Sequence, residues 1–135
     1  MIKGIVLACS FLVFSTILLS ACSPPAPPPA PTYFNITTVQ LDEMLKNKDF
    51  LLVNVHIPYE GEIPGTDLFV PFDEIEQNLS KFPADKGAKI VLYCRSGRMS
   101  AEAAADMVDL GFTNVWNVMG GMVAWGKEGN ELIHK

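Results

Sequence analysis

The sequence predicts an α/β domain in which a central parallel sheet carries helices on both faces. Short apolar runs rich in Val and Ile, such as residues 51–55 and 90–93, are typical of buried strands. Segments with helical spacing or strong helix formers, such as 101–110, lie between such runs. Strands that alternate with helices favour a parallel sheet, because each parallel connection needs a long crossover.

The first half of this region is expected to contain three strands and two helices. Strands are predicted at residues 33–36, 51–55 and 68–70. Thr37 and Gln40 have the spacing of a capping box, which predicts a helix from there to about Asn47. Apolar residues at helical spacing predict a second helix over 72–79.

The second half is expected to contain two strands and two helices. The strand at 90–93 ends at Cys94, and Ser100 is placed as the N-cap of a helix over 101–110. Gly111 is a typical residue at which such a helix stops. A last strand is predicted at 115–118, and Gly120-Gly121 leads into a short helix near residues 122–125. In parallel sheets ligands bind beyond the carboxyl ends of the strands, which is where Cys94 falls.

The N-terminus is expected to be an export signal rather than part of the domain. Lys3 is the only charged side chain in the first 41 residues, and residues 5–19 are almost wholly apolar. This run is too short for a good transmembrane helix. Residues 19–22, Leu-Ser-Ala-Cys, resemble the bacterial lipobox, in which the cysteine receives a diacylglycerol and becomes the new N-terminus. An ordinary cleaved signal followed by a stray Cys22 is the alternative.

These features predict three segments and a location. We expect a signal peptide at 1–21, a lipidated Cys22 with a linker at 22–32, and one domain at 33–135. Six of the ten prolines fall within 23–32, which favours an extended polyproline II spacer. The protein is then exported and held by lipid on the cell membrane, facing the periplasm or the cell exterior. The sequence leaves the choice between inner and outer membrane open.

Charge and cysteine content restrict the function further. The formal net charge of −5 argues against nucleic-acid binding and against electrostatic adhesion to anionic lipid. Of the three cysteines, Cys9 leaves with the signal and Cys22 is predicted to carry lipid, so Cys94 is the one thiol expected in the domain. With only two histidines, a metal site is not expected, and no cofactor is predicted.

The surroundings of Cys94 favour a reactive thiol over an inert buried one. Arg95 and Arg98 follow it closely, Gly97 permits a tight turn, and a helix comes next. A helix N-terminus offers unpaired N–H groups and a partial positive charge, which favour anions and lower the pKa of a nearby thiol. This layout predicts a thiolate nucleophile that faces an anionic substrate.

Several motifs resemble the rhodanese domain. The run Cys-Arg-Ser-Gly-Arg-Met-Ser-Ala at 94–101, followed by Gly-Phe-Thr-Asn-Val at 111–115 and Gly-Gly-Met-Val-Ala-Trp at 120–125, is similar to its second half. Residues 61–66 resemble the family's Gly-His-Ile-Pro-Gly-Ala segment, with Glu62 in place of His. The resemblance extends from about Tyr33 to Gly129 and implies a single rhodanese-like domain.

The resemblance implies sulfur transfer through a persulfide on Cys94. In this family the cysteine takes the outer sulfur of a donor and passes it to a nucleophilic acceptor in a ping-pong cycle. Thiosulfate or polysulfide is the expected donor, and a thiol or cyanide-like molecule, which can be a protein, is the expected acceptor. Arg95 and Arg98 are candidates for holding the sulfonate end of the donor. The substrate-binding residues implied are Arg95, Ser96, Gly97, Arg98, Met99 and Ser100, with Ser100 expected to act as a cap rather than a catalyst.

Two departures leave alternatives open. Where the family usually has Asp and Arg after the second strand, this chain has Asn54 and His56. His56 is interpreted as a structural replacement, with an acid–base or acceptor-recognition role as the alternative. A non-catalytic binding module remains an alternative function, and a phosphatase or arsenate reductase of the same fold is disfavoured. Those enzymes place arginine six residues after the cysteine, where this chain has Ser100.

Overall fold

The computed structural model describes residues 24–27 and 32–135. The predicted signal peptide, Cys22 and half of the proline-rich spacer at 23–32 therefore lie outside the described residues. Within the described ranges, no helix is both long enough and apolar enough to cross a membrane.

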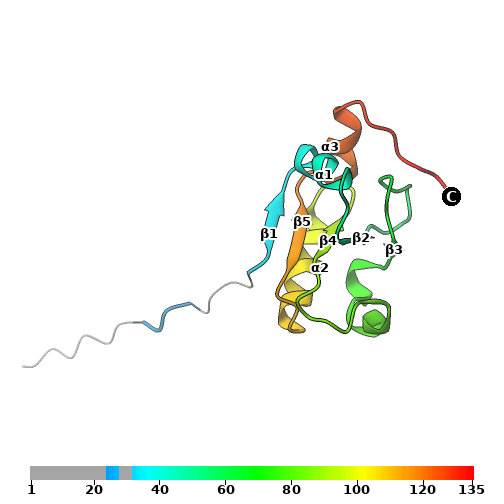
Figure 1. Ribbon diagram of the computed structural model, residues 1–135. Coiled ribbons are helices and arrows are strands. Elements are labelled where there is room, and N and C mark those ends of the chain that lie inside the picture. Colours follow the sequence, from blue (N-terminus) through cyan, green and yellow to red (C-terminus); the bar gives the residue numbers. More distant parts are fainter. Residues whose placement is uncertain (1–23, 28–31) are drawn as a thin grey trace, which may run out of the picture.

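A five-stranded parallel sheet forms the centre of the domain (Figure 1). The strands are β1 (Phe34–Ile36), β2 (Leu51–Asn54), β3 (Leu68–Phe69), β4 (Ile90–Tyr93) and β5 (Val115–Val118), in the spatial order β1-β5-β4-β2-β3. All four strand pairings are parallel, so the carboxyl ends of the strands meet at one edge of the sheet. Because β4 is the middle strand, Cys94 lies at the centre of that edge.

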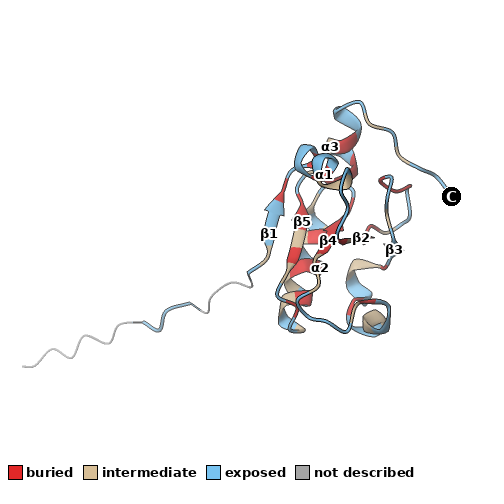
Figure 2. Ribbon diagram, in the orientation of Figure 1, coloured by how far each residue is buried: buried red, intermediate tan, exposed pale blue. Residues whose placement is uncertain are grey.

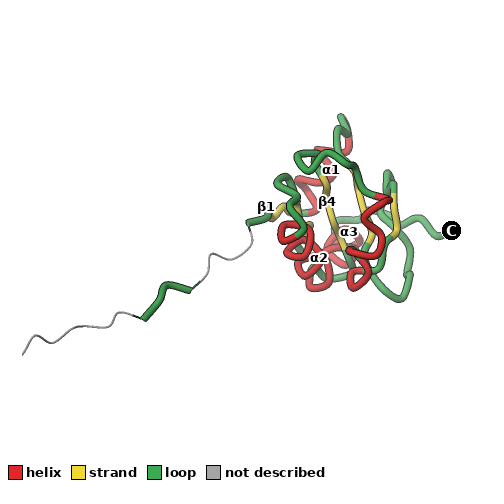
Figure 3. The backbone as a smooth tube through the Cα atoms, turned by 90° about the horizontal axis from the view of Figure 1, so that it is seen from below, coloured by secondary structure: helices red, strands yellow, loops and turns green. Residues whose placement is uncertain are grey.

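Helices cover both faces of this sheet, as predicted. They are α1 (Thr38–Leu45), α2 (Arg98–Asp109) and α3 (Gly121–Lys127), together with the short 3₁₀ helices η1 (Phe72–Glu74) and η2 (Glu76–Lys81). One apolar cluster joins the sheet to α2 through Ala103, Ala104 and Met107, and a second joins it to α1 and α3 through Leu41 and Trp125. Buried residues consequently concentrate in the sheet and on the inner sides of the helices (Figure 2), and the strands lie between helices when the domain is viewed from below (Figure 3).

The prediction of an α-helix over 72–79 was wrong, because this stretch is helical but of the 3₁₀ type. This stretch forms η1 and η2, and the backbone of Asn78 leaves the helical range. The Asn78 side-chain amide donates to the Glu74 carbonyl (2.8 Å), while its backbone N–H donates to Ile75 (3.2 Å). The side chain thus occupies the acceptor that an α-helix would use, which is a known effect of asparagine inside helices. Apolar spacing alone did not reveal this competition.

The capping box at the start of α1 is confirmed. The Gln40 backbone N–H donates to the Thr37 hydroxyl (3.2 Å), and the Thr37 backbone N–H donates to the Gln40 side chain (2.8 Å). This pairing satisfies two N–H groups that a helix start otherwise leaves unpaired. The helix ends at Leu45, close to the expected Asn47.

A buried tyrosine ties the loop after β2 to the end of β4. The Ile63 backbone N–H donates to the Tyr93 hydroxyl (2.9 Å), which also lies 2.8 Å from the Thr66 hydroxyl. Burial raises the pKa of Tyr93 strongly, so the phenol stays neutral and keeps these bonds at any physiological pH. The segment at residues 61–66, which resembles Gly-His-Ile-Pro-Gly-Ala, is therefore fixed to the side chain of the last residue of β4.

Candidate active site

Cys94 lies at the bottom of a tight loop between β4 and α2. Cys94 is buried, with 1% of its surface exposed. The loop ends at Gly97, the N-cap of α2, whose φ of +102° falls in the region that favours glycine. A Cβ at this position would also lie 3.2 Å from the backbone N of Gly120. Glycine at 97 therefore lets the chain turn into the helix directly after the cysteine.

The expectation that Ser100 caps this helix was wrong. The N-cap is Gly97 and the helix begins at Arg98, so Ser100 lies inside the first turn and is fully buried. Its hydroxyl donates to Asn117 Oδ1 (2.6 Å) and lies 3.5 Å from the Cys94 sulfur. Serine is common at N-caps and therefore predicts one at Ser100, but the positive φ of Gly97 allows the helix to start earlier.

The first turn of α2 surrounds the sulfur with hydrogen-bond donors. The Gly97 backbone N–H donates to Cys94 Sγ at 3.0 Å. Burial raises the pKa of Cys94, but the Ser100 hydroxyl and the N–H groups of Ser100, Gly97 and Ser96 together lower it below the ordinary value. The net result is a thiol that ionises more readily than a free cysteine. This agrees with the thiolate expected from the sequence.

Arg95 and Arg98 lie on the rim of the loop rather than against the sulfur. Both side chains are more than half exposed. Arg95 Nε lies 3.7 Å from the Glu60 carboxylate, and Arg98 Nη1 lies 2.5 Å from Glu102 one turn along α2. Exposed pairs of this kind are weak and exchange readily with other anions. The two guanidinium groups therefore remain able to meet an incoming anion at the mouth of the loop.

The remaining predicted loop residues have different surroundings. Ser96 is exposed on the loop surface, and Met99 packs against the apolar cluster that joins the sheet to α2. Beside the loop, a pocket of about 230 Å³ is lined by Glu60, Arg95, Met122, Val123 and Leu132. The predicted substrate-binding residues thus form one contiguous segment, but only its exposed members are open to a ligand from solvent.

The start of α3 holds the cysteine loop from the other side. The Met122 N–H donates to the Cys94 carbonyl (3.0 Å), and the Val123 N–H donates to the Arg95 carbonyl (3.0 Å). A Cβ on Gly121 would lie 2.1 Å from the Cys94 carbonyl oxygen, so only glycine lets the helix come this close. The Gly-Gly pair is therefore part of the site, because it brings two N–H donors to the loop backbone.

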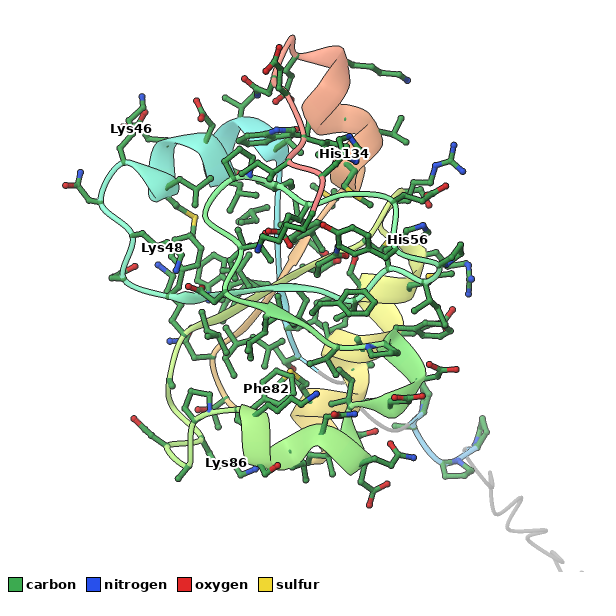
Figure 4. All side chains as sticks on the ribbon, turned by 90° about the vertical axis from the view of Figure 1, so that its right-hand side faces the viewer. Lys46, Lys48, His56, Phe82, Lys86 and His134 are labelled. Carbon is green, nitrogen blue, oxygen red and sulfur yellow. The ribbon has the colours of Figure 1, made fainter. Side chains whose placement is uncertain are left out.

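Asn54 and His56 connect the end of β2 to this loop. The Asn54 amide donates to the Gly61 carbonyl (3.0 Å) and accepts from the His56 backbone N–H (3.0 Å). His56 is buried, and its Nε2 lies 2.6 Å from Glu60, the residue that pairs with Arg95. Figure 4 places His56 in the half of the domain that carries the carboxyl ends of the strands, away from Phe82 and Lys86. Through these contacts His56 joins the end of β2 to Glu60 and Arg95 on the rim of the cysteine loop.

Comparison with known proteins identifies the fold family. A sequence profile described as "Rhodanese-like domain" matches residues 37–128. The chain belongs to this family. The matched range includes the loop at Cys94, both residues of the Gly-Gly pair and the departures at Asn54 and His56.

Three relatives illustrate the range of the family. A sulfurtransferase from Allochromatium vinosum is 36% identical over 89 residues, which cover 64% of this chain and 80% of the relative. The crystal structure of a rhodanese-related protein from Thermoplasma volcanium matches with a TM-score of 0.65 and 26% identity, over 76% of this chain and all of the other. A tRNA uridine(34) hydroxylase from Escherichia coli is 29% identical over 71% of this chain, which spans only 29% of that enzyme. Rhodanese-like domains are thus found both as small sulfurtransferases and within larger enzymes.

Three residues that are linked to the cysteine loop by hydrogen bonds or an ion pair were not predicted to belong to the site. Asn117 accepts from Ser100, Asn35 pairs with Asn117, and Glu60 links His56 to Arg95. Asn117 carries the only sequence signal, because a polar residue interrupts the apolar strand at 115–118. Nothing in the sequence indicated that Asn35 and Asn117 face each other, since 82 residues separate them.

Proposed function

We propose that this rhodanese-like domain is a sulfurtransferase that carries a sulfane sulfur as a persulfide on Cys94. The observation that carries this proposal is the position of the Cys94 sulfur, with the Gly97 N–H directed at it and the pKa of the thiol lowered. Backbone N–H groups fixed in place stabilise negative charge without reorganisation when the charge moves from one sulfur to the next. The identity to a sulfurtransferase over most of that relative supports the same reaction class.

The proposed first half-reaction uses thiosulfate or a related donor. The Cys94 thiolate attacks the outer sulfur of thiosulfate and forms a new S–S bond. The original S–S bond of thiosulfate breaks, and sulfite leaves with its electron pair, so the cysteine now ends in a persulfide anion. Arg95 and Arg98 meet the sulfonate end at the rim, because a guanidinium pairs well with a multi-oxygen anion.

The second half-reaction returns the enzyme to its starting state. A nucleophilic acceptor, such as cyanide or a thiolate, attacks the outer sulfur of the persulfide. The persulfide bond breaks, and the Cys94 thiolate leaves with the electron pair. With cyanide the product is thiocyanate, and no external oxidant or reductant is consumed.

Intact mass spectrometry tests this proposal directly. The chain with Cys9→Ser and Cys22→Ser keeps Cys94 as its one thiol and is incubated with thiosulfate. We expect a gain of one sulfur atom, mapped to the Cys94 peptide and removed by cyanide with release of thiocyanate. A protein that gains no sulfur from thiosulfate or from polysulfide would contradict the proposal and favour a non-catalytic binding module.

We further propose that the domain is held outside the cytoplasm by a lipid on Cys22. The lipobox resemblance at residues 19–22 and the proline-rich spacer support this. A proline-rich spacer would keep the cysteine loop clear of the bilayer surface. In bacteria, the wild-type chain should fractionate with membranes and be labelled by a radioactive fatty acid, whereas Cys22→Ser should lose the label. Retention of the label by Cys22→Ser would contradict lipidation at this residue.

A further inference from the structure

A chain of polar side chains runs through the core from the cysteine loop to the edge of the sheet. Ser100 and Asn117 are buried, with 0% and 4% of their surfaces exposed, and Asn35 is exposed on the edge strand β1. The Ser100 hydroxyl donates to Asn117 Oδ1 (2.6 Å), and Asn117 Nδ2 donates to Asn35 Oδ1 (2.9 Å). The chain begins 3.5 Å from the Cys94 sulfur.

The Ser100 hydroxyl has one proton and three acceptors within reach. These are Asn117 Oδ1 at 2.6 Å, the Gly97 carbonyl at 3.2 Å and Cys94 Sγ at 3.5 Å. A hydroxyl donates one hydrogen bond at a time, and the shortest contact is to Asn117. The sulfur therefore competes with a buried amide for this proton.

Asn35 determines which side of the Asn117 amide faces Ser100. The two asparagines stand opposite each other in the register of β1 and β5, and the Asn117 NH₂ group is directed to Asn35. This leaves the Asn117 carbonyl oxygen, an acceptor, on the Ser100 side. Burying an amide costs free energy unless its polar atoms are hydrogen-bonded, and an apolar residue at this position would form the same strand without that cost. Packing alone therefore does not explain asparagine at 117.

We propose that Asn117 is a positioning residue for the nucleophile, which holds the Ser100 hydroxyl proton away from the Cys94 sulfur, and that Asn35 fixes Asn117 in the orientation that does so. The inference rests on Cys94 being the nucleophile of the proposed function. Its consequence is a thiolate that the Ser100 hydroxyl stabilises only in part, because the hydroxyl is shared between the Cys94 sulfur and Asn117, whereas the backbone N–H groups remain directed at the sulfur. Such a thiolate keeps more of its nucleophilic strength, because each added hydrogen bond that stabilises a thiolate also makes it a weaker nucleophile.

The charged and titratable groups around Cys94 do not take part in this chain. They are Arg95 and Arg98 on the rim of the loop, His56 and Glu60 after β2, and Glu102 on α2. In the part of the chain that the structure describes, none of them makes a hydrogen bond to the Cys94 sulfur, to Ser100 or to Asn117. A substitution at Asn117 should therefore change the pKa of the Cys94 thiol through Ser100.

The test measures the ionisation of Cys94 rather than sulfur transfer. In the chain with Cys9→Ser and Cys22→Ser, the thiolate is titrated by its ultraviolet absorbance and by its rate of alkylation with iodoacetamide. We expect Asn117→Val to lower the pH midpoint of the Cys94 titration, because the freed Ser100 hydroxyl then donates to the sulfur. Below that midpoint, alkylation should be roughly threefold faster, since one added hydrogen bond gives about tenfold more thiolate but also weakens it as a nucleophile. An unchanged or raised midpoint would overturn the inference.

The double variant with Ser100→Ala separates this effect from general loosening of the loop. Ser100→Ala alone should raise the midpoint, and Asn117→Val should then cause no further shift, because the hydroxyl through which it acts is gone. An equal shift in both backgrounds would contradict the proposed route.

If Asn117→Val does not fold, as judged by circular dichroism, Asn117→Asp is tested instead, because its side chain is nearly the same size. It should raise the midpoint, because a carboxylate binds the Ser100 proton more tightly, and an unchanged or lowered midpoint would again overturn the inference.

These measurements stay informative if the proposed function fails. Titration and alkylation need no sulfur donor, so they report on Asn117 whether or not a persulfide forms. A protein that fails the thiosulfate experiment but shows the midpoint shifts would keep the positioning role of Asn117 and lose the sulfurtransferase assignment.

Discussion

Cys94→Ser is expected to abolish thiocyanate formation from thiosulfate and cyanide, a loss of at least roughly a thousandfold. Serine places an oxygen where the sulfur was and still accepts from the Gly97 N–H. The hydrogen-bond donors of the loop are enough to stabilise a thiolate, but they are not enough to ionise a serine hydroxyl at neutral pH. A serine oxygen also cannot carry the transferred sulfur as a persulfide. The measurement is steady-state turnover, with purified protein compared at equal concentration.

The other cysteines provide a matched control for this prediction. Cys94→Ser in the unprocessed full-length chain keeps the thiols of Cys9 and Cys22, whereas the converse variant, Cys9→Ser with Cys22→Ser, keeps only Cys94. The first should be inactive and the second should match the wild type. Because Cys94 is buried, the melting temperature of Cys94→Ser must be recorded with the rates. A folded Cys94→Ser protein that still turns over would show that Cys94 is not the nucleophile.

The fold was largely predictable because its elements are local and strongly patterned. The apolar run at 90–93 identified β4, and the capping box at Thr37 and Gln40 identified the start of α1. The order of strands and helices then implied the parallel sheet that the structure has. The sequence was less informative at 72–79, where the Asn78 side chain competes with the backbone and turns an expected α-helix into 3₁₀ turns.

The part of the site formed by residues adjacent in the sequence was predictable. The part formed by contacts between strands was not. Cys94, Arg95 and Gly97 are neighbours in the chain, so their spacing predicted a loop that stabilises a thiolate. The contacts of Ser100 with Asn117, and of Asn117 with Asn35, depend on which strands pair and in which register. No single segment contains that information, and the local sequence around Ser100 predicts only a cap.

Gly121→Ala is expected to damage the site more than any other change at a glycine. The new Cβ would lie 2.1 Å from the Cys94 carbonyl oxygen and 2.8 Å from the Arg95 carbonyl group, and both are backbone atoms. Backbone cannot move aside as a flexible side chain can, so either α3 or the cysteine loop must shift. Either shift breaks the bonds from Met122 and Val123 to the loop carbonyls. We expect the free energy of unfolding to fall by about 3 kcal/mol or more, together with loss of the lowered thiol pKa.

Gly111→Ala is the control that isolates the steric part of this effect. Gly111 also has a positive φ, at +93°, but a Cβ there would meet nothing within 4 Å. Its replacement should cost only the strain of a left-handed backbone, about 1–2 kcal/mol, and should leave the Cys94 titration unchanged. Urea unfolding measures both variants on one scale. If Gly121→Ala were no more destabilising than Gly111→Ala, the close approach of α3 to the cysteine loop would not be what requires the Gly-Gly pair. A larger loss at Gly121 accompanied by a shifted thiol midpoint would instead assign that pair to the support of the nucleophile.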